Sequence, residues 1–311
     1  MYQALYRKYR PQTFDEVVGQ TGVTQTLKMQ LQTGRLSHAY LFTGSRGTGK
    51  TSCAKILAKA VNCEHPEDGN PCNRCAACRA IDEGSCMDVL EIDAASNNGV
   101  DNVRTLRDDA IYSPAEVKMR VYIIDEVHML SLSAFNALLK TIEEPPAHLL
   151  FILATTELHK VPATILSRCQ RFSFRRLMPE DIAGRINECA WHEGIEIDQP
   201  AIALLSRLAD GAMRDGLSLL DQCSGSQVVD TEAVLNAMGL TGAYRTRELC
   251  QCIAEQNVQS ALAQFTRLWQ DGKDVSVLQQ WNRNVLCDRV VFIKQVGSAK
   301  KGDTLRWVFS K

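Results

Sequence analysis

The sequence predicts an α/β protein in which a parallel sheet flanked by helices is followed by a region built from helices alone. Two observations carry this prediction. In the first half, short apolar runs of strand length alternate with helix-like stretches, which is the pattern of a parallel sheet with helices on both faces. After residue 178 the strand pattern fades and short helical patterns take over. We find no internal repeats or low-complexity segments.

Five segments have the length and apolar character of strands. The runs 121–124 and 149–153 are almost continuously apolar, as buried parallel strands are. The last segment alternates Phe with Arg, so we expect Phe to point inward and Arg outward. The predicted strands are 40–42, 89–92, 121–124, 149–153 and 171–175.

Helical patterns occupy the gaps between these strands and most of the chain after them. The predicted helices are 51–62, 101–111, 133–143, 179–193, 199–209, 213–223, 230–236, 244–255, 258–270 and 275–293. We therefore predict three regions: an α/β domain over 1–178, a small helical domain over 179–241, and a further helical segment over 242–311.

Charge and hydropathy exclude several classes of protein. The chain has 311 residues with 35 Lys+Arg and 36 Asp+Glu, a formal net charge of −1. A surface coated with cations is excluded, so any DNA contact would be a local patch. No apolar run approaches the roughly 20 residues that span a bilayer, and the N-terminus lacks the apolar core of a signal peptide. We expect a soluble, cytoplasmic protein without membrane contact.

A phosphate-binding loop is the strongest motif. It fits G-x-x-x-x-G-K-[ST] between a predicted strand and a predicted helix, and consists of Gly44, Ser45, Arg46, Gly47, Thr48, Gly49, Lys50 and Thr51. Its glycines let backbone N–H groups surround phosphates beside a helix N-terminus. Lys50 would reach the β- and γ-phosphates and Thr51 would hold Mg²⁺. A glycine loop that merely turns is disfavoured by this context, and G-x-G-x-x-G, which a dinucleotide fold needs, is absent.

Five further residues are candidates for the same site. At the end of an apolar strand, Asp125 can hold Mg²⁺ and Glu126 can act as general base, although such pairs also cap helices. Thr155 and Thr156 end another strand, where a hydroxyl could reach the γ-phosphate. Alternatively, the two threonines are there only because threonine suits a β-strand. Arg214 begins a helix of the second domain and is either a phosphate contact or a solvated surface residue.

The cysteines indicate a metal site. Of the 12 cysteines, four gather within 63–78 with the spacing C-x8-C-x2-C-x2-C, namely Cys63, Cys72, Cys75 and Cys78. Four thiolates suit tetrahedral Zn²⁺ and leave no open position, so the site would be structural. An iron–sulfur cluster is disfavoured because the next cysteine, Cys86, is misplaced for that motif; free thiols are the third alternative.

These elements together resemble the AAA+ clamp-loader ATPases of bacterial DNA polymerase III, and among them the gamma/tau family, over residues 1 to about 223. Besides the phosphate loop and the cysteines, the matching segments are Tyr6-Arg7-Lys8-Tyr9-Arg10-Pro11-Gln12-Thr13-Phe14, Val18-Gly19-Gln20, His38-Ala39-Tyr40-Leu41-Phe42, Glu91-Ile92-Asp93-Ala94-Ala95-Ser96, Asp125-Glu126-Val127-His128-Met129-Leu130, Phe135-Asn136-Ala137-Leu138-Leu139-Lys140, Glu143-Glu144-Pro145-Pro146 and Ile165-Leu166-Ser167-Arg168-Cys169. The cysteine insert and the Ser-Arg-Cys motif separate gamma/tau from other AAA+ proteins.

The resemblance implies roles for individual residues. Arg168 looks like an arginine finger supplied to the ATP of a neighbouring subunit, where it would stabilise charge on the γ-phosphate. Thr156 aligns with the family's sensor 1 and Arg214 with its sensor 2. The resemblance also implies an adenine pocket that includes Arg10, Pro11 and Val18.

The resemblance also implies cofactors, partners and a reaction. It implies ATP, Mg²⁺ and structural Zn²⁺, and ATP hydrolysis at subunit interfaces of a homo- and hetero-oligomeric pentameric ring. The ring would open a sliding clamp and place it on primer-template DNA. Beyond Gly242 the likeness weakens, and because the sequence stops at Lys311 we expect a shortened helical collar. An ATP-inert scaffold subunit and a small-molecule P-loop kinase are the competing interpretations.

Overall fold

A computed structural model of the chain describes residues 2–225, 228–238, 257, 259–260, 262–263 and 266. It divides into two compact units, Met1–Thr231 and Glu232–Lys311. The account below concerns the first unit and the helix α11 (Thr231–Ala237) at its end. Apart from the isolated positions, the helices predicted beyond residue 242 lie outside the described residues, so the proposed collar remains a prediction.

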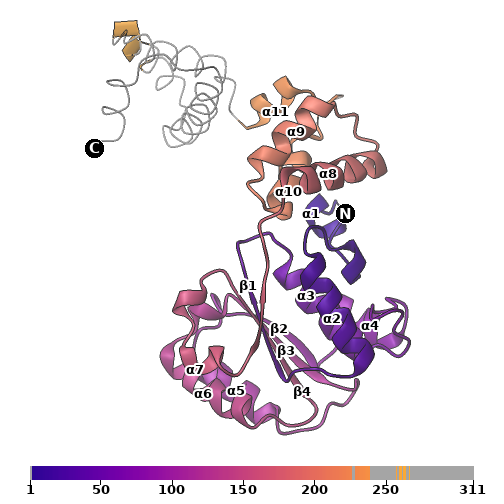
Figure 1. Ribbon diagram of the computed structural model, residues 1–311, viewed down its shortest axis with the longest axis vertical. Coiled ribbons are helices and arrows are strands. Elements are labelled where there is room, and N and C mark those ends of the chain that lie inside the picture. Colours follow the sequence, from indigo (N-terminus) through magenta and orange to yellow (C-terminus); the bar gives the residue numbers. More distant parts are fainter. Residues whose placement is uncertain are drawn as a thin grey trace, which may run out of the picture. The chain divides into compact units, whose positions relative to one another are not determined.

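The first unit is built on a five-stranded sheet in which every described pairing is parallel (Figure 1). Its strands are β1 (Ala39–Thr43), β2 (Val89–Asp93), β3 (Arg120–Asp125), β4 (Leu149–Thr155) and β5 (Gln170–Ser173). The spatial order is β2-β3-β4-β1-β5. All five strands lie where the sequence predicts them, which confirms the predicted parallel sheet.

Helices cover both faces of the sheet, as predicted (Figure 1). The helices α2 (Thr21–Thr33) and α3 (Lys50–Asn62) pack on one face. The other face carries α5 (Val100–Asp109), α6 (Leu132–Glu143) and α7 (Ala163–Leu166). Because side chains alternate along a strand, Leu153 points to the α5–α7 side while its neighbour Ile152 points to the α2–α3 side.

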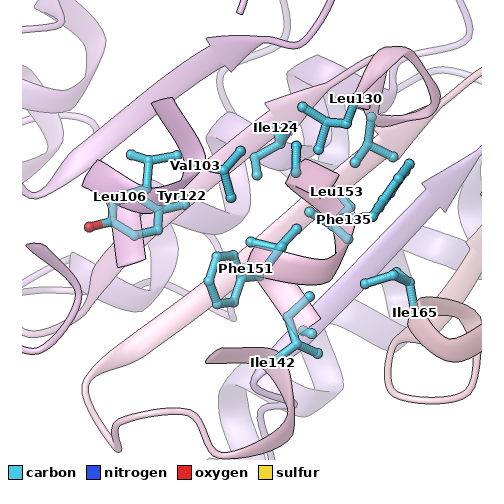
Figure 2. Close-up of a cluster of buried hydrophobic side chains, with 14 of the residues drawn as sticks. Val103, Leu106, Tyr122, Ile124, Leu130, Phe135, Ile142, Phe151, Leu153 and Ile165 are labelled. Atoms are coloured by element: carbon cyan, nitrogen blue, oxygen red, sulfur yellow. The ribbon is translucent and has the colours of Figure 1, made fainter. Parts of the chain in front are cut away.

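The core between the sheet and α5–α7 is closely filled. Figure 2 shows Phe151 and Leu153 of β4 among side chains from these helices, with Ile142 of α6 and Ile165 of α7 completely buried. This packing explains why β4 is apolar from Leu149 to Ala154, since both of its faces are covered.

We expect Leu153→Ala to destabilise the protein by about 2–5 kcal/mol, because deleting a fully buried leucine side chain leaves a cavity in this core. The control is Leu132→Ala, since Leu132 is 71% exposed at the start of α6. Urea unfolding followed by circular dichroism measures both. Equal midpoints for the two variants would contradict this description of the core.

The helices of the second predicted domain follow the sheet. They are α8 (Pro179–Glu193), α9 (Gln199–Leu208) and α10 (Met213–Cys223), followed by α11. Local chemistry sets their ends: α8 begins on Pro179 and ends at Gly194 in a left-handed conformation. The Asp198 carboxylate accepts a hydrogen bond from the Ala201 N–H at 2.6 Å and caps α9. The domain boundaries themselves stay predictions.

Several elements were not predicted from the sequence. They are α1 (Leu5–Lys8), α2, α4 (Ala76–Glu83), α7 and three 3₁₀ turns at Phe14–Glu16, Val127–Met129 and Leu158–Lys160. Most are a single turn, and α2 begins with threonine and glycine, which are poor helix formers. Among the described residues, no helix combines the length and the apolar composition that crossing a membrane requires.

Candidate nucleotide site and four-cysteine cluster

The phosphate-binding loop lies between β1 and α3, as its motif predicts. Gly44, Gly47 and Gly49 all have positive φ. A Cβ on Gly44 would stand 2.4 Å from the Phe174 carbonyl oxygen, and one on Gly47 would stand 2.7 Å from the Ala212 Cβ. Glycine is therefore required at two places, because the residue after β5 and the residue before α10 lie directly against this loop.

Lys50 is held inside the loop. Its Nζ donates hydrogen bonds to the carbonyl oxygens of Gly44 and Ser45, each at 2.8 Å. Burial lowers the pKa of Lys50, while the negative charges of Glu126 and Asp125 act in the opposite direction. A buried ammonium group within a glycine-rich loop is suited to receive a multiply charged phosphate.

Two oxygen donors for a metal meet beside Lys50. The Thr51 hydroxyl at the start of α3 donates a hydrogen bond to Asp125 Oδ2 at 2.6 Å, and Asp125 is the last residue of β3. The topology explains this meeting: β1, which leads into the loop before Thr51, and β3 lie on either side of β4, and the carboxyl ends of parallel strands share one edge of the sheet. A hydroxyl and a carboxylate at one place are the ligands that Mg²⁺ prefers.

Glu126 is engaged by the end of β4. Its Oε2 accepts hydrogen bonds from the Thr156 N–H at 3.2 Å and from the Thr156 hydroxyl at 2.9 Å. Glu126 has φ +48°, a conformation that non-glycine residues seldom adopt. Thr155, in contrast, is fully buried. The structure thus brings Thr156, and not Thr155, to the carboxylate predicted to act as base.

Two residues of this site were given no role from the sequence. His128 Nδ1 lies 3.0 Å from the Thr155 hydroxyl and 3.3 Å from Glu126 Oε2. Gln20 is buried and its amide donates to the carbonyl oxygens of Thr48 and Arg175. Both residues lie in segments that resemble the family, and this resemblance was the sequence signal that could have identified them.

A cavity of about 1200 Å³ opens beside the loop. The predicted site residues that line it are Arg10, Pro11, Val18, Arg46, Gly47, Thr48, Gly49, Lys50, Thr51, Asp125, Glu126 and Arg214. Residues distant in sequence therefore meet at one place, including those predicted to surround adenine. Gly44, Ser45 and Thr156 adjoin this group through their hydrogen bonds to Lys50 and Glu126.

The helical domain contributes to the same cavity through the start of α10. The Met213 N–H donates to the Gly47 carbonyl oxygen at 3.0 Å. The next residue, Arg214, places its guanidinium carbon 4.7 Å from the centre of the Tyr6 ring. Arg214 thus stands between the phosphate loop and the N-terminal helix α1, where it can respond to a bound phosphate.

Arg168 lies elsewhere. It follows α7, its guanidinium forms an ion pair with Glu143 at 2.6 Å, and it donates to the Thr164 carbonyl oxygen at 2.8 Å. It is not among the residues that line the cavity. Arg168 is therefore separate from the phosphate loop of its own chain.

The four clustered cysteines converge. The Sγ atoms of Cys63, Cys72, Cys75 and Cys78 all lie within 4.8 Å of one another. Tetrahedral zinc with Zn–S bonds of about 2.3 Å requires sulfur separations of about 3.8 Å, so this set fits the ion after a small contraction. The thiols come from the end of α3, from the loop after it and from the start of α4.

The thiols of this cluster differ in acidity. Burial raises the pKa of Cys63 and of Cys78. At Cys72 burial acts the same way, but hydrogen bonds from the N–H groups of Arg74 and Cys75 outweigh it and lower the pKa to about 6. Because metal ligands bind as thiolates, metal binding at this cluster would be coupled to the release of protons.

Comparison with known proteins was made by family and by fold. Residues 19–178 match the family model described as DNA polymerase III, delta subunit, and residues 181–224 match DNA polymerase III clamp loader subunit, ATPase lid domain. DNA polymerase III subunit tau of Bacillus subtilis (strain 168) is 52% identical over 279 residues, covering 89% of this chain and 50% of that protein. The tau subunit of Escherichia coli (strain K12) is 47% identical over 264 residues, covering 84% and 41%.

The chain therefore spans half or less of the length of these relatives. Among solved structures, the Thermotoga maritima RuvB Holliday junction branch migration motor superposes with a TM-score of 0.56 at 18% identity, covering 80% of each chain. At that identity the likeness concerns the fold alone.

Proposed function

The chain belongs to the gamma/tau family of DNA polymerase III clamp-loader subunits, and from this we propose that it is an ATP-driven motor subunit of a clamp loader. In this role it binds and hydrolyses ATP so that a sliding clamp is opened and placed on primer-template DNA. The observation that carries the proposal is the meeting of Lys50, Thr51 and Asp125 at one cavity. An ATP-inert scaffold would not need these three groups together.

Each residue of the site has a proposed part in the reaction. Lys50 and the loop N–H groups bind the phosphates, and Thr51 and Asp125 hold Mg²⁺, which neutralises charge on the phosphate oxygens. Glu126 is the general base for the attacking water. The Thr156 hydroxyl donates a hydrogen bond to Glu126 Oε2. We therefore propose that Thr156 controls when this carboxylate is free to take a proton.

Nucleotide state would be read at two further places. Arg214, at the start of α10, would report a bound γ-phosphate to the helical domain. Arg168 would reach the ATP of a neighbouring subunit, which accords with its separation from the cavity of its own chain. Arg10, Pro11 and Val18 would form the adenine wall. We propose a pentameric ring of like and unlike subunits, cytoplasmic, in which ATP lies between neighbours.

The test of this function is ATP turnover in the assembled clamp loader with and without a sliding clamp and primer-template DNA. A motor subunit predicts stimulation by both together, and less by duplex DNA that lacks a primer end. Turnover that ignores clamp and DNA would contradict the motor. Phosphate transfer to a small acceptor instead of water would establish the kinase alternative.

We infer that the four cysteines hold one structural zinc ion. All four donors are thiols, and three of the four are buried. Metal analysis by mass spectrometry is expected to find one zinc per chain, and Cys78→Ser is expected to abolish it and lower the unfolding temperature. Cys53→Ser is the control, since Cys53 is buried outside the cluster. Iron with visible absorption, or no metal, would contradict the inference.

A further inference from the structure

Lys59 is a buried cation that the proposed reaction does not use. It lies on α3, two turns after Thr51, and its side chain is 1% exposed. Its Nζ donates to Gln12 Oε1, to Asn73 Oδ1 at 2.8 Å and to the carboxylate of Asp82 at 2.9 Å. Three acceptors satisfy all three N–H groups of the ammonium, so its desolvation is compensated.

These acceptors come from two parts of the chain that lie far apart in sequence. Asn73 lies between Cys72 and Cys75, and Asp82 lies on α4, which begins directly after Cys75. Gln12, in contrast, belongs to the N-terminal segment between α1 and α2. Lys59 therefore ties the four-cysteine insert to the N-terminal segment across the surface of α3.

Asparagines of the insert hold the backbone of that same segment. The Asn73 amide donates to the Gln12 carbonyl oxygen at 3.3 Å. The Phe14 N–H donates to Asn70 Oδ1 at 2.9 Å, and the Asn70 amide donates to Asp15 Oδ2 at 2.7 Å. Between α1 and α2 the structure describes the short 3₁₀ turn Phe14–Glu16. Side chains of the insert therefore satisfy backbone groups of this segment that a helix or a sheet would otherwise satisfy.

The segment held in this way is a wall of the nucleotide cavity. Arg10, Pro11 and Gln12, which precede Phe14 in the sequence, line the cavity, and so do Val17 and Val18, which follow it. Lys59 and Asp82 reach the edge of the same cavity. The Arg10 Nε also donates to the Ser52 hydroxyl on α3 at 3.3 Å. The position of Arg10 and Pro11 thus depends on contacts that lead through Gln12 to Lys59 and the insert.

We propose that Lys59 is a positioning residue through which the four-cysteine insert fixes the wall of the nucleotide cavity formed by Arg10, Pro11 and Gln12. This inference rests on the proposed nucleotide site. The insert has a very small core, formed by Cys63, Cys75 and Cys78 with Cys72 and Ala77 packed against it, so the cluster itself must keep it ordered. Order in the cluster is then transmitted to the base-binding side of the cavity, while the phosphate loop is built independently on β1 and α3.

Two variants test this coupling without altering a cysteine. Lys59→Met keeps the length of the side chain, and the Asp82 carboxylate it leaves behind is 35% exposed and can be hydrated. Asn73→Gly removes the contacts to Lys59 and to Gln12 while tolerating the φ of +56° at this position. The control is Arg74→Gln, which breaks an exposed ion pair with Glu67 in the same insert.

Calorimetric titration with ATP and with inorganic tripolyphosphate is the measurement, alongside zinc content and circular dichroism of each variant. Lys59→Met and Asn73→Gly are expected to raise the Kd for ATP about tenfold, the scale of one lost hydrogen-bonded contact. The Kd for tripolyphosphate should stay within about twofold, since the phosphate loop is intact, and Arg74→Gln should leave both unchanged.

Folded variants that bind ATP as the wild type does would overturn the proposal. So would an equal loss of ATP and tripolyphosphate affinity, which would mean a general loss of the site. If either variant fails to fold, the other decides, because each breaks the connection at a different residue. Failure of the wild-type chain itself to bind ATP would instead contradict the proposed function.

Discussion

Lys50→Ala is expected to abolish nucleotide binding, with the Kd for ATP rising by about 10²–10⁴-fold. The side chain would give two or more hydrogen bonds from a buried charge to phosphate, each worth about 1.5–3 kcal/mol. The fold should survive, because Lys50 contacts the carbonyl groups of its own loop and does not belong to either sheet-face core. Calorimetric titration with ATP measures the loss.

The matched control is Lys140→Ala, which removes an exposed lysine on α6. It should bind ATP as the wild-type chain does, with an unchanged circular dichroism spectrum in both variants. Unchanged ATP affinity in Lys50→Ala would show that the phosphate loop is not the nucleotide site.

Arg168→Ala is expected to leave ATP binding nearly normal while hydrolysis in the assembled complex falls by about 10³–10⁵-fold, the usual contribution of an arginine finger. The two effects separate because Arg168 lies outside the cavity of its own chain and forms an ion pair with Glu143 on the surface. Binding is measured on the isolated chain, and turnover in the complex.

A basic edge that contacts DNA is the competing explanation for Arg168. Arg171 lies nearby in sequence and is exposed, so Arg171→Ala is the control for loss of a surface cation. If Arg168 contacts DNA, its loss should weaken DNA binding in a salt-dependent way and leave basal turnover intact. If Arg168→Ala and Arg171→Ala both weaken DNA binding modestly and both leave hydrolysis normal, Arg168 is not an arginine finger.

The parallel sheet and the phosphate loop were predictable because their physical causes are local. β4 is buried on both faces and is therefore apolar from Leu149 to Ala154, and the loop carries glycines where a Cβ would collide with its surroundings. Helices with proline starts and glycine ends, such as α8, were likewise predicted over the correct residues.

The remaining features depend on partners far away in sequence. The helix α2 begins with threonine and glycine, and it is held by packing of Val23, Leu27 and Leu31 against the core. The fold brings His128 to Glu126 and Lys59 to Gln12, and these contacts could not be predicted from the sequence around each residue. The sequence pattern alone did not decide whether Thr155 or Thr156 contacts the Glu126 carboxylate, since both residues suit the end of a strand.

Arg168 illustrates a further limit. Its sequence motif suggests a role in catalysis, but the atoms on which it would act belong to another subunit. The described chain therefore shows where Arg168 is held and what it does not contact, while its proposed target lies across an interface.

The most direct test of ATP hydrolysis shared between subunits is the ATPase activity of a complex assembled from a mixture of Lys50→Ala and Arg168→Ala subunits. Each variant alone should be inactive in the complex. In the mixture, an interface that joins the intact phosphate loop of an Arg168→Ala subunit to the intact arginine of a Lys50→Ala subunit should hydrolyse ATP, so activity should return. A mixture as inactive as its components, or an Arg168→Ala complex with wild-type turnover, would contradict the account.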